Sequence, residues 1–339
     1  MCPENIAEHK LKKILIIGLS CLGDNLLITP AIKKIKETFP EASFDIIIGP
    51  GAVDFAIENP WFKEYFVYDK KKSIFKLIGK VRKKRYDLIV DFRNSFLPFF
   101  LRGKYKLTFF IKEFFSDKMF THESERVLSF LEPFFGKEKD IKLHFPLTKV
   151  YKEKCEEIFL KHKIKKSDSI VVFCPGANFE KKRWDKDKFA QLGKELFKYY
   201  DIKIIVVGSK NEIPLCEEVT EKINDKNAIN LAGKTNIREL ASILSVSDLL
   251  ITNDTGTMHL ASAVGCPIVA IFGPGNPYRY GPIGVRNYVV HAEIDCFPCK
   301  VESKCKIDFE CLKRVTVEQV LKAAMLILDE KQQPYLFEI

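Results

Sequence analysis

Residues 253–259 form the polar turn of this chain that is best suited to bind an anion. The apolar run 249–252 predicts a buried strand before the turn, and a helix is expected from about Thr255 to Gly265. The first N–H groups of a helix have no acceptor within it and lie at the positive end of its dipole, so they attract phosphate. The alternative is an ordinary capped turn with a histidine that faces the core. The residues predicted to surround a phosphate are Asp254, Thr255, Gly256, Thr257 and His259.

A second polar segment, residues 18–25, contributes a carboxylate. It matches neither the dinucleotide-binding fingerprint nor the Walker loop, because the required glycine and lysine positions are not there. Asp24 lies in the first turn of the helix that this segment opens. It is either an acid stabilised by the helix dipole or a general base that removes a proton from an acceptor hydroxyl.

Two more turns at predicted strand ends carry charged residues. Gly176 follows one strand, and Lys182 and Arg183 come later in the same loop. These cations suit a diphosphate that departs as a leaving group, although ordinary surface charge explains them as well. Glu212 follows the next strand and could accept hydrogen bonds from ribose hydroxyls, which is a weaker signal by itself.

Alternating strands and helices must position these turns, so the fold class expected is α/β with parallel sheets. A length of 339 residues and an apolar content of 46% suit two domains, each with its own core. The charged stretch 161–168 is the predicted boundary, which gives domains at 1–165 and 166–339. Strands are predicted at 13–18, 44–48, 86–92, 169–174, 202–208, 229–232, 249–252 and 268–273. Helices are predicted at 24–39, 74–84, 123–135, 186–200, 214–223, 237–245, 255–265 and 317–328.

The composition also limits where the protein works. No run reaches the roughly 18 apolar residues that a membrane-spanning helix needs. Residues 1–13 are polar and lack the core of a signal peptide, so a cytoplasmic protein is expected. The ten cysteines agree with this, because four of them cluster near the C-terminus and the rest are scattered, unlike a secreted disulfide framework.

The net charge of +10 comes from one part of the chain. A basic window, residues 61–120, contains 16 Lys and Arg against 6 Asp and Glu, and the charges in the remainder of the chain are balanced. Basic residues interleaved with phenylalanine suit a surface that faces anionic lipid or another polyanion. A solvated basic helix face backed by a core face is the alternative. The phenylalanines are Phe92, Phe96, Phe99, Phe100, Phe109, Phe110, Phe114 and Phe115.

Six segments, in this order, resemble glycosyltransferase family 9, the ADP-heptose:lipopolysaccharide heptosyltransferases. They are Gly18-Leu-Ser-Cys-Leu-Gly-Asp24, Thr29-Pro30-Ala31, Tyr86-Asp87-Leu-Ile-Val-Asp91, Pro175-Gly176-Ala177 with Lys182-Arg183-Trp184, residues 253–259, and Phe272-Gly273-Pro274. The resemblance covers about residues 13–328. The Asp-Thr-Gly-x-x-His segment and the Leu-Gly-Asp loop are together its most specific part.

The resemblance implies a GT-B fold, in which two Rossmann-like doubly wound domains face a central cleft and the C-terminal one holds the donor. The last helix of such a fold can pack back on the N-terminal domain. The implied reaction is an inverting, metal-independent transfer. Asp24 would activate the acceptor hydroxyl, and Lys182 would neutralise the departing ADP. The main chain of 255–257 would cradle the diphosphate, Asp254 and His259 would arrange that turn or reach the sugar, and Glu212 would bind the ribose.

The resemblance also gives the basic window a partner. A family acceptor is a phosphorylated or Kdo-bearing lipid A core at the cytoplasmic face of the inner membrane, and the N-terminal domain receives it. Arg93, Arg102 and Lys104 are therefore predicted to bind the acceptor. A transient contact with the membrane surface and a peripheral location follow from the same implication.

The clustered cysteines are Cys296, Cys299, Cys305 and Cys311. Four thiols at short spacing suit a tetrahedral zinc or iron site, and some protein-modifying relatives of the family use cysteine-bound iron there. Reduced structural cysteines are the alternative, because the spacing is not that of a common zinc module. A metal here would be structural, and none is expected to be required for catalysis.

Three alternative functions remain open from the sequence. The first is a GT-B transferase with another nucleotide sugar, or with a protein or capsule acceptor. The second is a nucleotide-sugar epimerase on the same scaffold. The third is a non-catalytic binder of nucleic acid, favoured only by the basic window, since the chain has no recognised RNA or DNA motif. No nucleic-acid partner is therefore expected.

Overall fold

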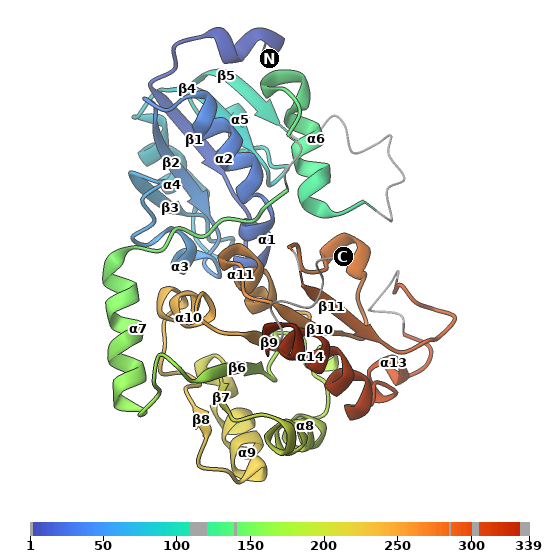
Figure 1. The fold of residues 1–339 in the computed structure, drawn as a ribbon. Coiled ribbons are helices and arrows are strands. Elements are labelled where there is room, and N and C mark those ends of the chain that lie inside the picture. Colours follow the sequence, from blue (N-terminus) through green and yellow to red (C-terminus); the bar gives the residue numbers. More distant parts are fainter. Residues whose placement is uncertain (1–2, 109–120, 139–140, 285, 300–304, 333–339) are drawn as a thin grey trace, which may run out of the picture. The chain divides into compact units, whose positions relative to one another are not determined.

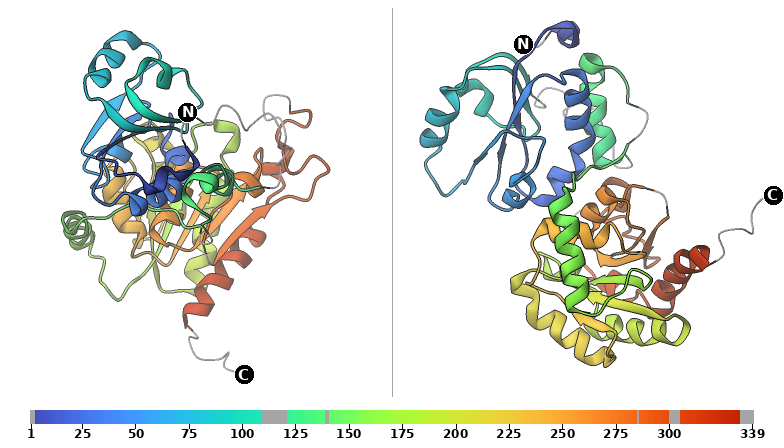
Figure 2. Two further views of the ribbon diagram at one scale, coloured as in Figure 1. Left: turned by 90° about the horizontal axis from the view of Figure 1, so that it is seen from above. Right: turned by 60° about the vertical axis from the view of Figure 1, so that its left-hand side comes forward.

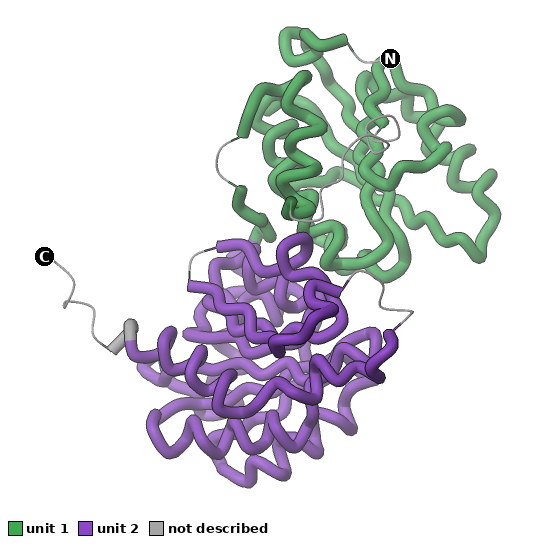
Figure 3. Tube along the Cα trace, turned by 90° about the vertical axis from the view of Figure 1, so that its right-hand side faces the viewer, with its two compact units in different colours: residues 1–146 green, residues 147–339 purple. Residues whose placement is uncertain are grey.

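The protein consists of two compact units, Met1–Pro146 and Leu147–Ile339, drawn in green and purple in Figure 3. The computed structural model describes residues 3–108, 121–138, 141–284, 286–299 and 305–332. The observed division lies before the predicted one at 165/166, because α7 (Lys149–Lys161) belongs to the second unit. Its Tyr151 and Cys155 are buried where α7 packs against α10 (Ile237–Leu244). Charge in the 161–168 stretch marks the end of this helix, not the division.

The first unit is a five-stranded parallel sheet in the order β3-β2-β1-β4-β5. Helices α4 and α5 lie on one face of the sheet and α2 and α6 on the other (Figure 2). Strands β3 and β5 were not predicted from the sequence. The strands are β1 (Lys13–Ile17), β2 (Ser43–Ile48), β3 (Glu64–Val67), β4 (Tyr86–Asp91) and β5 (Gly103–Thr108). The helices are η1 (Glu4–Glu8), α1 (Leu22–Leu27), α2 (Thr29–Thr38), α3 (Val53–Ala56), α4 (Ile74–Arg82), α5 (Leu97–Phe100) and α6 (Glu123–Phe135).

The single helix predicted at 24–39 is wrong, because the structure has α1 and α2 in its place. Pro30 has no N–H to donate to the carbonyl of Leu26, four residues earlier. The Thr29 hydroxyl donates to that carbonyl instead, at 2.6 Å. The break leaves α1 as a short separate helix that carries Asp24.

The second unit is a six-stranded parallel sheet in the order β11-β10-β9-β6-β7-β8. Helices α8, α9 and α14 cover one face, and α10 and α11 cover the other (Figure 1). The strands are β6 (Ser169–Cys174), β7 (Ile202–Val206), β8 (Ala228–Asn230), β9 (Leu249–Asn253), β10 (Ile268–Phe272) and β11 (Asn287–His291). The other helices are η4 (Glu180–Lys182), α8 (Lys186–Tyr199), η5 (Lys210–Glu212), α9 (Ile213–Ile223), α11 (Gly256–Val264), α12 (Pro277–Tyr280), α13 (Glu310–Lys313) and α14 (Val317–Gln332).

The terminal helix α14 packs against α8 and against strands β9 to β11 of its own unit. Its buried residues Val320, Ala324 and Ile327 belong to the core cluster of the second sheet. A return of the last helix to the N-terminal domain, which the resemblance implied, stays a prediction. Strand β11 and helix α7 were not predicted from the sequence.

In both sheets the chain begins at a central strand and adds strands outward to one edge. It then returns to the other side of that central strand and adds strands outward to the opposite edge. In such sheets ligands bind beyond the carboxyl ends of the strands, where the winding reverses. That point lies between β1 and β4 in the first unit and between β6 and β9 in the second. The segments predicted to do chemistry follow β1, β6, β7 and β9, so three of the four lie at a reversal point.

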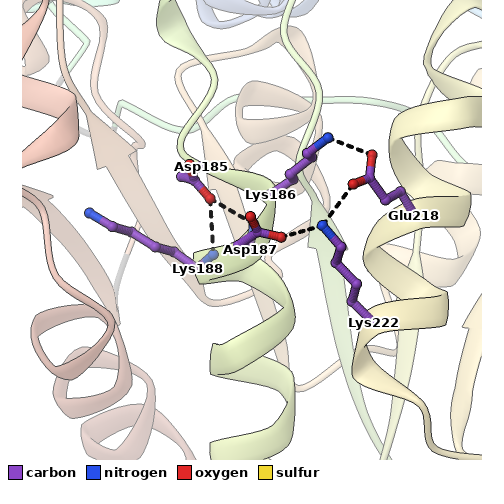
Figure 4. Close-up of polar contacts among 6 residues, drawn as sticks. All are labelled: Asp185, Lys186, Asp187, Lys188, Glu218 and Lys222. Carbon is purple, nitrogen blue, oxygen red and sulfur yellow. Dashed lines mark hydrogen bonds and ion pairs between the residues drawn. The ribbon is translucent and has the colours of Figure 1, made fainter.

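The start of α8 is fixed by a polar network next to the loop that carries the predicted phosphate-binding cations (Figure 4). The Asp185 carboxylate caps the helix by accepting from the main-chain N–H groups of Asp187, at 2.7 Å, and Lys188, at 3.3 Å. Glu218 of α9 binds both Lys186 and Lys222, at 2.6 and 2.7 Å. A single exposed ion pair adds little stability, so the Asp185 cap is the main interaction that fixes where the loop ends and α8 begins.

Candidate active site

The predicted phosphate-binding turn lies at the carboxyl end of β9, directly before α11. Residues 254–257 are partly exposed, whereas the strand before them and the helix after them are buried. Gly256 and Thr257 are the first residues of α11, so their main-chain N–H groups have no acceptor within the helix. The helix ends at Gly265 with φ of 81°, a conformation that glycine adopts without strain. The strand, the turn and the helix predicted for this segment are confirmed.

Lys182 and Asp254 form an ion pair at the edge of the turn, although they are 72 residues apart in sequence. The Nζ to Oδ2 distance is 2.8 Å, and both side chains are largely shielded from solvent. Lys182 comes from the loop after β6 and Asp254 from the loop after β9, so adjacent parallel strands bring them together. The pair holds the lysine ammonium close to the start of α11.

Asn253 is the residue that joins these two loops, and it was not singled out from the sequence as a site residue. Its side chain is fully buried. The amide oxygen accepts from the main-chain N–H of Trp184 at 2.9 Å. The amide nitrogen donates to the carbonyls of Pro175, at 2.8 Å, and Gly176, at 3.3 Å. An asparagine directly before an Asp-Thr-Gly turn is the signal that could have identified it.

Glu212 and Arg183 lie against the glycine of the β6 loop. A Cβ atom on Gly176 would stand 2.1 Å from the Glu212 carboxylate, so only glycine fits here without displacing that side chain. Arg183 donates to the carbonyl of Ala177 at 3.0 Å, and its guanidinium is 3.8 Å from the Glu212 carboxylate. Glu212 also accepts from the N–H and hydroxyl of Ser209, which fixes its orientation. The three predicted residues Gly176, Arg183 and Glu212 are therefore neighbours.

The threonines of the turn direct their hydroxyls inward, toward Cys174. Burial raises the pKa of the Cys174 thiol, and hydrogen bonds with Thr257, Thr252 and Thr255 offset part of that rise. The main-chain N–H groups are thus the donors that remain for a ligand. His259 is buried within α11. Both roles predicted for His259, arranging the turn or reaching the sugar, stay predictions.

Asp24 lies beyond the carboxyl end of β1, in α1. Its side chain reaches solvent, yet protein surrounds enough of it that loss of hydration raises the pKa of the carboxyl group, and the negative charge of Glu123 raises it further. Within the described part of the chain, no cation forms an ion pair with Asp24. A carboxylate with a raised pKa holds a proton more strongly, which suits a general base. Glu123, from the start of α6, was not predicted to take part.

Two side chains hold the loop before Asp24 in place. Asn25 is fully buried; its amide oxygen accepts from the N–H of Leu19 at 3.0 Å, and its amide nitrogen donates to the carbonyls of Leu19 and Cys21. Arg93, after β4, donates to the carbonyl of Gly18 at 3.0 Å and to the Ser20 hydroxyl at 3.1 Å. Arg93 therefore adjoins the Asp24 loop, and its role in acceptor binding stays a prediction.

The other two predicted acceptor-binding residues lie elsewhere. Arg102 and Lys104 are exposed at the start of β5, level with the amino end of β4. Asp24 follows the carboxyl end of β1, which pairs in parallel with β4. The structure thus brings Arg93 near Asp24 but places Arg102 and Lys104 at the opposite end of the strands.

The basic window contains both buried and exposed phenylalanines. Phe92 is buried, whereas Phe96, Phe99 and Phe100 are exposed. Phe109, Phe110, Phe114 and Phe115 lie outside the described residues. In the part of the chain that the structure covers, no helix is long and apolar enough to cross a bilayer.

Three of the clustered cysteines lie between β11 and α13, and Cys311 lies within α13. Cys296 is exposed, Cys299 and Cys305 are partly buried, and Cys311 is buried. Burial is the main cause of the raised pKa of Cys311, and the nearby thiols Cys305, Cys296 and Cys299 raise it further. Among the described residues, no three His, Cys, Asp or Glu side chains are arranged to hold a metal ion. The metal site stays a prediction, and no reaction step depends on it.

Known proteins with similar sequences show the family of this chain. The model of glycosyltransferase family 9 (heptosyltransferase) matches residues 74–308. Lipooligosaccharide heptosyltransferase 2 of Campylobacter jejuni is 32% identical over 328 residues, which are 93% of this chain and 98% of that protein.

Solved structures agree on the fold. A family 9 glycosyl transferase from Veillonella parvula superposes with a TM-score of 0.79 at 23% identity and covers 94% of this chain and 97% of its own. The ADP-heptose lipopolysaccharide heptosyltransferase II of Escherichia coli gives 0.74 at 21% identity, covering 94% of this chain and 99% of its own. The predicted GT-B fold of two Rossmann-like domains is confirmed. The matched family model spans most of the chain, so this protein belongs to glycosyltransferase family 9 and is a glycosyltransferase.

Proposed function

We propose that this glycosyltransferase moves heptose from ADP-heptose to a hydroxyl of the lipopolysaccharide inner core, on Kdo or on a heptose attached to lipid A. One observation carries the proposal. The loops after β6, β7 and β9 bring Lys182, Arg183, Glu212 and the N-terminus of α11 to one edge of the second sheet. The chain that builds this site aligns along 93% of its length with a lipooligosaccharide heptosyltransferase.

The second unit would bind the donor. The main-chain N–H groups of 255–257 would hold the diphosphate, with the positive end of the α11 dipole behind them. The Lys182 ammonium would neutralise the negative charge that develops as ADP departs, which stabilises the transition state more than the bound donor. Asp254 would keep that ammonium in position through their ion pair. Glu212, held by Ser209 and close to Arg183, would accept hydrogen bonds from the ribose.

The first unit would supply the base. Asp24 would take the proton of the acceptor hydroxyl while the oxygen attacks the anomeric carbon, with inversion at that carbon. The raised pKa of Asp24 makes this proton transfer more favourable than for an ordinary aspartate. No metal takes part in this proposal, because a lysine and main-chain N–H groups supply the charge stabilisation.

The acceptor also bears on where the enzyme works. A lipid A core is anchored in a membrane, so the enzyme must reach the membrane surface to meet it. We place the protein in the cytoplasm, at the cytoplasmic face of the inner membrane, in transient contact with anionic lipid. The excess of positive charge in residues 61–120 supports this placement.

The decisive experiment incubates the purified protein with ADP-heptose and with two defined acceptors, Kdo-lipid A and heptosyl-Kdo-lipid A. We expect release of ADP only when an acceptor is present, together with a product heavier by one heptose. The rate should be unchanged by a chelator such as EDTA. UDP- and GDP-linked sugars serve as donor controls. ADP release that does not need an acceptor, or a product formed only from another donor, would refute the proposal.

A further inference from the structure

Four exposed phenylalanine rings on and beside α4 and α5 are a feature of the first unit that the proposed reaction does not use. A folded domain buries most of its large aromatic side chains, so a group of exposed rings indicates an interaction surface. Helices α4 and α5 pack against each other on the same face of the sheet (Figure 2). The exposed fractions are 78% for Phe75, 67% for Phe96, 72% for Phe99 and 55% for Phe100.

These rings are not part of the core of their own unit. The core side of α4 is formed by Ile74, Leu77, Ile78 and Val81, which pack in one cluster with Leu97 and Leu101 from the α5 region. Phe75 lies on the other side of α4, four residues before Gly79. A Cβ atom added to Gly79 would meet no atom within 4 Å, so this side of the helix is open within the described structure. Phe75, Phe99 and Phe100 are therefore exposed side chains that lie outside this cluster.

The same surface is strongly basic. Residues 70–86 contain nine Lys and Arg and no Asp or Glu, and residues 92–107 contain four and none. Lys76 and Lys80 on α4 and Lys83 directly after it are exposed, and none of them forms an ion pair with a described residue. By contrast, Lys84 at the end of the same segment is paired with Glu64 and Asp45. No described acidic side chain therefore neutralises these three lysines, and an external anion can meet them.

We infer that this aromatic–basic patch, defined by Phe75, Phe99, Phe100, Lys76, Lys80 and Lys83, docks on the surface of a bilayer that contains anionic phospholipid. The rings would enter the interfacial region, and the ammonium groups would meet the headgroups. The inner side of α4 stays packed on its own sheet, so only ring tips can insert and the contact is shallow and reversible. The inference rests on the proposed function insofar as it explains how the enzyme meets a lipid-borne acceptor.

A bilayer fits this surface better than a nucleic acid does. The exposed rings lie on and beside two short helices, and among the described residues no strand presents them as a platform for stacking on successive bases. A flat anionic surface meets the rings and the lysines together. Because exposed charges attract it, the contact should weaken as salt rises.

Flotation with vesicles tests the inference without donor or acceptor. The wild-type protein should bind vesicles of phosphatidylethanolamine and phosphatidylglycerol at 50 mM salt and should bind phosphatidylcholine vesicles at least about tenfold more weakly, roughly 1.4 kcal/mol. The double variant Phe75→Ser, Phe99→Ser should lower anionic-vesicle binding at least about tenfold. The triple variant Lys76→Gln, Lys80→Gln, Lys83→Gln should lower it to a similar extent. These side chains are exposed, so the variants should keep the melting temperature of the wild type.

Two matched controls come from the second unit. One control is the double variant Leu160→Ser, Tyr199→Ser, which removes two exposed apolar side chains. The other is the triple variant Lys152→Gln, Lys194→Gln, Lys226→Gln, which removes three positive charges, as many as the lysine variant of the patch. Both controls should bind vesicles like the wild type. Three results would overturn the inference: equal losses in patch and control variants, equal binding of the wild type to neutral and anionic vesicles, or patch variants that lose binding to an RNA oligonucleotide while they keep vesicle binding. Turnover of a delipidated core acceptor should be unchanged in the patch variants. A failure of heptose transfer would leave the vesicle result intact, so the two proposals fail separately.

Discussion

Two aspartates, Asp24 in the first unit and Asp254 in the second, occupy similar places in similarly wound sheets and have different surroundings. Each lies in or just before a helix, beyond the carboxyl end of a strand at the reversal point. Asp254 is paired with the Lys182 ammonium at 2.8 Å. Asp24 has Glu123 as its charged neighbour, and burial and that charge raise its pKa. One fold pattern thus gives an acid that positions a cation and an acid that can accept a proton, and the neighbours from distant segments make the difference.

A buried asparagine stabilises the loops of each site, but one binds its own loop and the other binds a loop that is distant in sequence. Asn25 binds Leu19 and Cys21, so it shapes its own loop. Asn253 binds Trp184 and Pro175, so it connects two loops that are far apart in sequence. We therefore expect damage to Asn25 to stay near Asp24 and damage to Asn253 to reach the donor site.

The largest expected effect is that of Asp24→Asn. Removal of the base should lower kcat by about 10²- to 10⁴-fold, because general-base catalysis contributes on that scale. The affinity for ADP, measured by calorimetry, should stay within a few-fold of the wild type, since the donor site belongs to the other unit. Loss of ADP affinity with unchanged turnover of bound donor would show that Asp24 is not the base.

Lys182→Met should have the next largest effect. It removes the cation that stabilises departing ADP and should lower kcat by about 10²- to 10³-fold, the usual loss when one transition-state donor is removed. Lys181→Met is the matched control, because Lys181 is exposed one residue away and lies over the Phe309 ring. Similar losses in both variants would mean that general charge, and not the pair with Asp254, matters here.

Asn253→Ala should weaken ADP binding by about 10-fold and lower the melting temperature, because it leaves buried main-chain groups of two loops without their partner. Asn25→Ala should lower turnover and leave ADP affinity unchanged. Calorimetry with ADP and steady-state kinetics on both variants make the comparison. If both variants lose ADP affinity equally, the two asparagines do not act separately in the two units.

Glu123→Gln should have the smallest effect, a shift in the pH profile. Glu123 raises the pKa of Asp24, so its removal should lower that pKa. Asp24 works as a base when ionised, and activity is lost as the pH falls through its pKa. The acid limb of kcat/KM should therefore move to lower pH, with the same plateau at higher pH. An unchanged acid limb would mean that another group controls it.

Most elements that carry the site could be predicted from the sequence, because each is local. The apolar run before Asp254, the Thr-Gly turn and the glycine stop at Gly265 predicted a strand, an anion-binding turn and a helix, and the structure has all three. The prediction of one helix through Pro30 was wrong because Pro30 has no N–H to donate. The Thr29 hydroxyl donates to the Leu26 carbonyl instead, and α1 ends there. Of the edge strands of the described sheets, β8 was predicted, but β3, β5 and β11 were missed because they lack the long apolar runs of central strands.

The sequence by itself determined the α/β class, the family and the chemistry available in each turn, since these depend on residue types and on spacing within about ten positions. Only the tertiary structure decided which turns are neighbours. Strand order places Lys182 beside Asp254 and Asn253 under Trp184, and it sends Arg102 and Lys104 to the opposite end of the strands from Asp24. Packing within the first unit also buries Asp24 in part and puts Glu123 near it, and both effects raise the pKa of Asp24. Charges act through space, so what each residue can do depends on partners that the order of residues in the chain does not reveal.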